Sequence, residues 1–104
     1  MIREDGYINA TQLCKSGGKE YSNWFRNNRS NILIESLCKK LDTTIDRLIQ
    51  KTLTGVNENR STWVHPTIGL DIAQWISVDF FLTTIDWINE WKNLQKDNHI
   101  KNLR

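Results

Sequence analysis

The chain has 104 residues and a formal net charge of +2, from 14 Lys and Arg against 12 Asp and Glu. This length fits one domain with its own hydrophobic core, so we expect a single domain over residues 1–104 whose last residues, 95–104, fray. A charge of +2 is too small to indicate nucleic-acid binding by itself. The sequence lacks the apolar run of about 18 residues that a membrane helix needs, and its first residues lack signal-peptide features. We therefore expect an intracellular protein that is not secreted and has no membrane partner.

Positive charge is concentrated in the first sixty residues. They hold ten Lys or Arg and seven Asp or Glu, a net of +3, whereas the remaining residues hold four and five, a net of −1. The densest basic patch is opposed only by Glu20 and is interleaved with aromatic side chains and asparagines. Such a mixture suits a surface that faces phosphates and offers hydrogen-bonding groups beside them. The patch comprises Lys15, Lys19, Arg26 and Arg29, with Tyr21, Trp24 and Phe25 among them.

The first predicted elements are a hairpin and a short helix. Asp5-Gly6 is typical of a tight hairpin turn, and apolar residues alternate with polar ones around it. Thr11 has a side chain suited to an N-cap, and Gly17-Gly18 disfavours continuation of a helix. We therefore predict a strand followed by a helix of about two turns.

A mainly helical region is expected after the two glycines. Ser22 can cap a helix that continues through Arg29, and either Ser30 or Asn31 marks a break or a kink after it. The helical region should end near Lys51. Apolar residues within it have the i, i+3, i+4, i+7 spacing of a core-facing helix, namely Ile34, Leu37, Cys38 and Leu41.

A second β-hairpin is expected between Thr52 and His65, where β-branched residues flank an exposed polar tip. Pro66 suits the first position of a following helix, and Ser77 can cap a long last helix. Trp24 lies inside the basic patch, where an exposed indole could stack on a base. The other four tryptophans are expected in the core, namely Trp63, Trp75, Trp87 and Trp91.

This order of elements, with helices followed by a basic hairpin, predicts an α+β fold with a winged helix-turn-helix arrangement, in which small β-hairpins pack on helices. In such a fold one helix enters a groove of DNA, and the hairpin, called the wing, contacts the neighbouring backbone or minor groove. The hairpin tip should then be part of the contact surface.

Four blocks of the sequence resemble the KilA-N domains of large DNA viruses and phages. DGYINATQLC at residues 5–14 resembles the opening signature of the family, and WFR at residues 24–26 resembles its W-L-R-type segment. STWVHP at residues 61–66 and IAQWIS at residues 72–77 resemble two further blocks. In order and spacing these blocks cover nearly the whole chain.

The KilA-N family is similar in turn to the DNA-binding domains of fungal APSES transcription factors. The resemblance therefore implies an α+β fold and nucleic-acid binding by a viral protein. It also implies a location inside the host cell, in the cytoplasm of the viral factory or in the nucleus. Two positions depart from the pattern, since Ser61 stands where Gly is common and Val78 stands where Pro often follows the serine. Ser61 narrows the backbone conformations open to the hairpin, whereas Val78 only removes a preferred first-turn residue.

The predicted contact surface combines the basic patch with the hairpin tip. Arg26 and Arg29 lie three residues apart and share one face if their helix is continuous, and nearby asparagine amides can pair with adenine edges. Lys15 and Lys19 flank two glycines and could hold a phosphate. The predicted nucleic-acid-binding residues are Lys15, Lys19, Asn23, Arg26, Asn27, Asn28, Arg29, Lys51, Asn57, Asn59 and Arg60.

We expect double-stranded DNA as the partner, with RNA as the alternative nucleic acid and a protein partner or homodimer left open. No catalytic site, metal or cofactor is expected, because Cys14, Cys38 and His65 match no common pattern of metal ligands or nucleophiles. His65 precedes a helix start and is expected to cap or pack there. The alternative function is a viral protein-interaction adaptor or host-factor antagonist that keeps the fold without DNA binding, which the low net charge favours.

Overall fold

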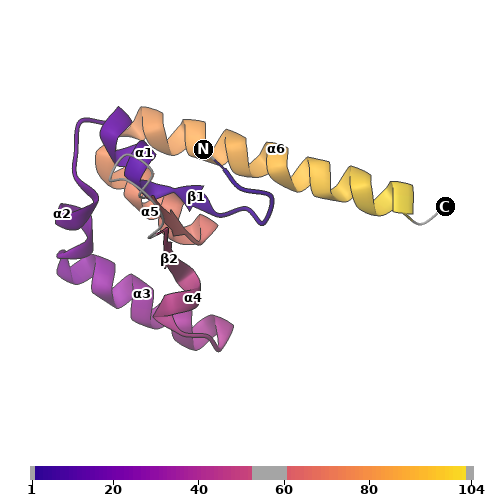
Figure 1. The fold of residues 1–104 in the computed structure, drawn as a ribbon. Helices are drawn as coiled ribbons and strands as arrows, with labels where there is room; N and C mark the ends of the chain where they lie inside the picture. The colour runs from indigo at the N-terminus through magenta and orange to yellow at the C-terminus, as the bar shows by residue number, and fades with distance from the viewer. Residues whose placement is uncertain (1, 53–60, 103–104) are drawn as a thin grey trace.

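The computed structural model describes residues 2–52 and 61–102, with side chains as far as residue 96. Figure 1 shows the long C-terminal helix along one edge of the molecule, with the small sheet and the shorter helices beside it. The predicted α+β class is confirmed. The elements in chain order are β1 (Ile8–Asn9), α1 (Ala10–Ser16), α2 (Tyr21–Phe25), α3 (Asn28–Leu41), α4 (Ile45–Leu48), β2 (Ile49–Lys51), β3 (Thr62–Val64), α5 (Pro66–Ile76) and α6 (Val78–Asn102).

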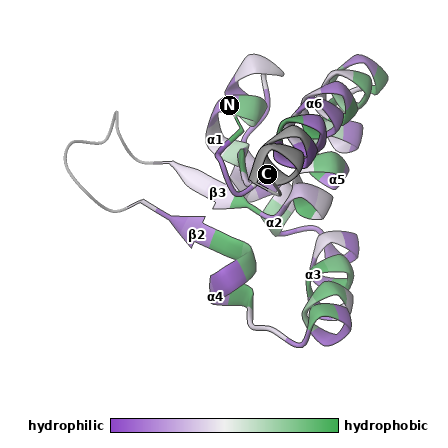
Figure 2. Cartoon of the chain, turned by 90° about the vertical axis from the view of Figure 1, so that its right-hand side faces the viewer, coloured by the Kyte–Doolittle hydropathy of each residue, from purple (hydrophilic) through white to green (hydrophobic). Residues whose placement is uncertain are grey.

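The sheet has β3 at its centre, antiparallel to both β1 and β2. The antiparallel pairing of β2 with β3 confirms the predicted second hairpin, and Figure 2 shows the pair on the side of the molecule opposite α3 and α6. The hairpin begins earlier than predicted. Ile49 pairs with Val64, so residues 49–51, which the sequence placed in the helical region, form a strand instead. Pairing with a segment distant in the chain decides this conformation, and local helix preference does not.

The opening turn at Asp5-Gly6 is formed as predicted. The Arg3 amide donates to the carbonyl of Tyr7 at 2.7 Å, and Ile2 forms an antiparallel bridge with Ile8. Gly6 has φ of +89°, and a Cβ atom there would lie 2.9 Å from the ring of Trp91. Glycine is therefore required at position 6 for two reasons, the backbone conformation and the close approach of α6.

Helix α1 begins one residue after Asn9, whose side-chain oxygen accepts from the Gln12 amide at 3.0 Å. The prediction of Thr11 as the N-cap was therefore wrong. The Thr11 hydroxyl instead accepts from the Thr62 amide at 3.0 Å and joins α1 to β3. The helix ends at Ser16, before Gly17, as predicted.

The break between α2 and α3 falls at Arg26 and Asn27, and the predicted break at Ser30 or Asn31 was wrong. Ser30 is buried within α3. Ser22 does not cap α2 either, since the cap position is Glu20 and its side chain makes no capping bond. The break follows Trp24, whose burial fixes the direction of α2 against the rest of the molecule.

The hydrophobic core lies between the sheet, α1, α3 and the α5–α6 pair. Trp24 belongs to this core and is only 1% exposed, so the prediction of an exposed indole at Trp24 was wrong. The four tryptophans assigned to the core are only half-buried. Trp75 and Trp87 pack against the core from outside. A Cβ atom at Gly69 would meet Ile8 at 2.6 Å, which shows how closely α5 packs on β1.

Helices α5 and α6 start as predicted. Pro66 takes the first position of α5, and the Ser77 hydroxyl accepts from the Phe80 amide at 3.2 Å at the start of α6. Helix α6 continues to Asn102, and the fraying of residues 95–104 stays a prediction. His65 is the N-cap of α5, since its Nδ1 accepts from the Thr67 amide at 3.1 Å. The expected capping role of His65 is confirmed.

His65 should make the stability of the domain pH-dependent. Burial lowers the pKa of this imidazole below its ordinary value of 6.5. The unfolded chain then binds the proton more readily than the folded one, so stability is full above about pH 6.5 and is lost as the pH falls below it. Protonated Nδ1 also cannot accept from Thr67. We expect His65→Asn, which keeps an N-cap acceptor, to lose less stability than the parent in urea unfolding between pH 7.5 and 5.5. Equal losses in both proteins would contradict this.

Candidate nucleic-acid interface

A hollow of about 600 Å³ lies between α1, α2 and the base of the β2–β3 hairpin. We call it the basic hollow, because three cationic side chains from three elements line it and none of its described lining residues is acidic. Each cation is exposed to solvent. The lining residues are Thr11, Lys15, Tyr21, Ser22, Phe25, Arg26, Lys51, Thr52, Ser61 and Thr62.

Hydrogen bonds fix the walls of the basic hollow. The bond from Thr62 to Thr11 joins β3 to α1, and the Thr52 amide donates to the Ser61 carbonyl at 2.8 Å across the base of the hairpin. Lys51 stands next to this closed base, and Lys15 is in the last turn of α1. Lys15 and Lys51 are thus carried on segments that are tied together, which keeps their positive charges near one another.

Arg26 completes the basic hollow from the end of α2, where its amide donates to the carbonyl of Ser22 at 3.1 Å. The two ion pairs formed between described residues are Arg3–Asp5 and Arg29–Asp71, and neither involves a cation of the hollow. Asp46 lines an adjoining hollow together with Phe25 and Lys51, but it forms no ion pair with Lys51. Cations that are not engaged in an ion pair attract an anion. The chemistry that suits the hollow is therefore phosphate binding.

Two of the predicted cations lie against α5 instead. Arg29 contacts Asp71 at 3.3 Å, and the same carboxylate accepts from the Trp24 indole at 2.9 Å. Lys19 donates to the Trp75 carbonyl at 3.1 Å, and its ammonium lies 4.4 Å from the centre of the Trp75 ring. These contacts separate Lys19 and Arg29 from the basic hollow.

Arg26 and Arg29 do not share a helical face, because Arg26 lies in the break that follows α2 and Arg29 lies on α3. That sequence-based prediction was wrong. Asn27 lines a smaller hollow of about 260 Å³ together with Arg29 and Asp71. Asn23 on α2 and Asn28 at the start of α3 are exposed. The predicted wing residues Asn57, Asn59 and Arg60 lie outside the described residues.

Sequence reasoning missed the uncharged part of the basic hollow. The mixture of aromatic and basic residues in the sequence hinted at Tyr21 and Phe25. Nothing in the sequence places the hydroxyls of Thr11 and Thr62 beside them, because the two residues meet only through the bond between α1 and β3.

The two cysteines are free thiols, with Cys14 buried in the core and Cys38 half-buried. Burial raises the pKa of Cys14 to about 11, so the thiol is neutral at physiological pH and is a poor nucleophile. Among the side chains that the structure describes, no three His, Cys, Asp or Glu gather as metal ligands would. No helix within the described part of the chain has the length and apolar character needed to cross a membrane.

Comparison with known proteins identifies the family. The model of the KilA-N domain matches residues 1–94. The chain belongs to the KilA-N domain family. KilA-N domain-containing protein L32 of Acanthamoeba polyphaga mimivirus is 41% identical over 100 residues, which cover 95% of this chain and 27% of that protein. No solved structure matches the chain.

Other KilA-N relatives come from further viruses. Protein FPV248 of fowlpox virus is 33% identical over 95 residues, covering 88% of this chain and 63% of its own length. KilA-N domain-containing protein 006L of invertebrate iridescent virus 6 is 30% identical over 105 residues, which cover 90% of this chain and 30% of that protein. This chain spans 20 to 30% of the length of the first three mimivirus relatives. KilA-N domains are generally associated with DNA binding.

Proposed function

We propose that this KilA-N domain binds double-stranded DNA with modest sequence specificity, through the basic hollow and the hairpin at its rim. The observation that carries the proposal is the convergence of Lys15, Arg26 and Lys51 from α1, α2 and β2, without an acidic residue among the described lining. Contacts between cations and phosphates supply most of the affinity of such an interface, and their affinity does not depend on sequence.

In this proposal α2 and α3 form the helical pair of a winged helix-turn-helix, and the β2–β3 hairpin is the wing. Lys51 stands at the base of the wing and belongs to the phosphate contacts. Asn57, Asn59 and Arg60 remain proposed contacts of the wing tip. Asn23 on α2 and Asn28 at the start of α3 are exposed, and their amides can pair with base edges. Asn27, Lys19 and Arg29 lie near α5 and are proposed as weaker contacts.

We propose no catalytic role and no cofactor for this chain. The relatives are viral, which supports action inside an infected host cell. RNA and a protein partner or second copy of the chain remain compatible with an exposed basic surface. We further propose that residues 1–104 form one domain, which the family match over residues 1–94 supports.

Single alanine substitutions test the location of the interface. Arg26→Ala and Lys51→Ala should each weaken duplex binding by roughly 0.5–2 kcal/mol, or about 2- to 30-fold in Kd, because each removes one phosphate contact. Arg29→Ala should cost less, since Asp71 already engages this side chain. The measurement is fluorescence anisotropy with a labelled duplex at low salt.

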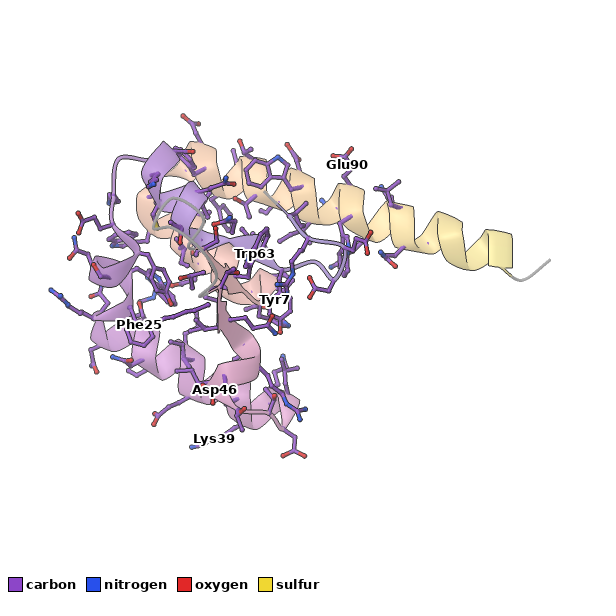
Figure 3. All side chains as sticks on the ribbon, in the orientation of Figure 1. Tyr7, Phe25, Lys39, Asp46, Trp63 and Glu90 are labelled. Atoms are coloured by element: carbon purple, nitrogen blue, oxygen red, sulfur yellow. The ribbon has the colours of Figure 1, made fainter. Side chains whose placement is uncertain are left out.

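The matched control is Lys39→Ala. Lys39 is exposed in the last turn of α3, and Figure 3 shows it at the end of that helix away from Phe25 and α2. Its removal should leave Kd unchanged within twofold. If Lys39→Ala weakened binding as much as Arg26→Ala, the proposed location would be wrong. If the parent bound no nucleic acid at low salt, the protein-interaction alternative, which the net charge of +2 favours, would replace the proposal.

A further inference from the structure

The shape of the basic hollow points to a more specific ligand than a smooth duplex. A reading helix or wing is convex and enters a groove of DNA, whereas this site is a concave hollow between α1, α2 and the hairpin base that is open to solvent. A concave site of about 600 Å³ has the size of pockets that bind small molecules. It must therefore receive a group that protrudes from the nucleic acid, which is either a phosphate or a base outside the helical stack.

The lining of the hollow distinguishes these two groups. Cations alone would suffice for a phosphate, yet Phe25 lines this hollow and is 38% exposed overall, although exposing an aromatic ring to water is unfavourable. The ring of Tyr21 lies 5.9 Å from that of Phe25 with 37° between their planes, so the two form one aromatic wall. Figure 3 places Phe25 on α2, the segment that separates α1 from α3.

Aromatic walls flanked by cations are typical of sites for unstacked nucleobases, because every base has a face that can stack and a backbone phosphate close to it. Here Lys15, Arg26 and Lys51 surround the wall. Ser22 and Thr62 line the same hollow, and a hydroxyl group can donate to or accept from a base edge. All the parts of such a site are thus present within one hollow.

We propose that the basic hollow binds one unstacked nucleobase of DNA, which stacks on Phe25 while the cations hold its flanking phosphates. This inference rests on the proposed function and narrows its ligand to DNA with an unpaired or extruded base. The base can come from a bulge in a duplex or from a single strand, and both sources present the same chemistry.

The test compares three labelled DNA probes of matched sequence at one low salt concentration: an intact duplex, the same duplex with one extrahelical base, and the single strand. Base–aromatic stacking has a typical strength that corresponds to about 5- to 100-fold in Kd. We expect the bulged duplex, the single strand, or both, to bind more tightly than the intact duplex by a factor in this range. The probe that gains affinity identifies the source of the base.

Substitutions at Phe25 assign the gain to this site. Phe25→Ala should abolish the gain, measured as the ratio of the intact-duplex Kd to the bulged or single-stranded Kd of the same variant, whereas Phe25→Tyr, which keeps an aromatic face, should retain it. Ile32→Ala is the matched control, because Ile32 is an exposed apolar side chain of α3 outside the hollow. It should retain the gain fully. Circular dichroism melting confirms that each variant is folded.

The outcomes separate the two proposals. A gain that persists in Phe25→Ala, or equal affinity of all three probes for the parent, would overturn the base-binding inference while leaving duplex binding in place. Failure of every probe to bind the parent would instead overturn the proposed function itself. A 2-aminopurine at the extrahelical position adds an independent readout, since stacking on Phe25 should lower its fluorescence in the parent and not in Phe25→Ala.

Discussion

Replacing Trp24 by alanine should destabilise the domain by roughly 3–5 kcal/mol, the usual cost of deleting a large aromatic side chain from a core. Trp24 is 1% exposed, and its indole donates to Asp71 at 2.9 Å. The substitution therefore leaves a cavity and removes the partner of a carboxylate that also engages Arg29. Urea unfolding followed by circular dichroism measures the change.

Trp75→Ala is the control for this prediction. Sequence reasoning places Trp75 in the core, but the residue is half-buried and packs beneath the ammonium of Lys19. Its replacement should cost clearly less than that of Trp24, because part of its surface already contacts water. A loss of stability for Trp75→Ala equal to that for Trp24→Ala would contradict the account of the core.

The second large effect concerns binding. Reversing all three charges of the basic hollow, by Lys15→Glu, Arg26→Glu and Lys51→Glu together, should weaken duplex binding at least about 100-fold at low salt, since three attractive phosphate contacts become repulsive. All three side chains are exposed, so the fold should persist with a melting temperature close to that of the parent. Fluorescence anisotropy and thermal melting provide the two measurements.

A second triple variant separates the location of charge from its total amount. Lys39→Glu, Lys40→Glu and Lys92→Glu also change the formal net charge by −6, from +2 to −4, at exposed positions outside the basic hollow. If only overall charge mattered, both variants would lose affinity equally. We expect the fold-increase in Kd of this second variant to be less than about one tenth of that of the variant in the basic hollow, because screening weakens distant charges.

Much of the fold was predictable because short-range chemistry determines it. Pro66 and Ser77 start α5 and α6 where expected, and Gly17 ends α1, since caps and breakers act on their own backbone neighbours. The Asp5-Gly6 turn belongs to the same class, with Gly6 at φ of +89°. These signals need no knowledge of the rest of the molecule.

The errors arise where distant residues decide the outcome. Ile49 is a strand residue because it pairs with Val64. Trp24 is buried in the core, where Asp71, 47 residues away, accepts the hydrogen of its indole. Thr11 resembles an N-cap in sequence, yet its hydroxyl accepts from Thr62. Periodicity and cap preferences contain no information on such long-range partners.

In the candidate site, too, local features were predictable and long-range contacts were not. Charge and the nearby aromatic residues drew attention to Lys15 and Arg26 in the sequence, and Lys51 was among the predicted contacts. The sequence did not show that these three would line one hollow while Lys19 and Arg29 lie against α5. The position of the break between α2 and α3 decides this separation. The position of the break depends on tertiary packing, which the spacing of residues in the sequence does not reveal.

The most direct test of the central claim is the salt dependence of duplex binding. If phosphate contacts provide the affinity of this KilA-N domain, a plot of log Kobs against log salt concentration should be linear with a slope of about −3 to −6, for four to six released counterions. The triple charge reversal in the basic hollow should flatten this slope by about 3. A parent slope near zero, or the same slope in parent and variant, would contradict the account.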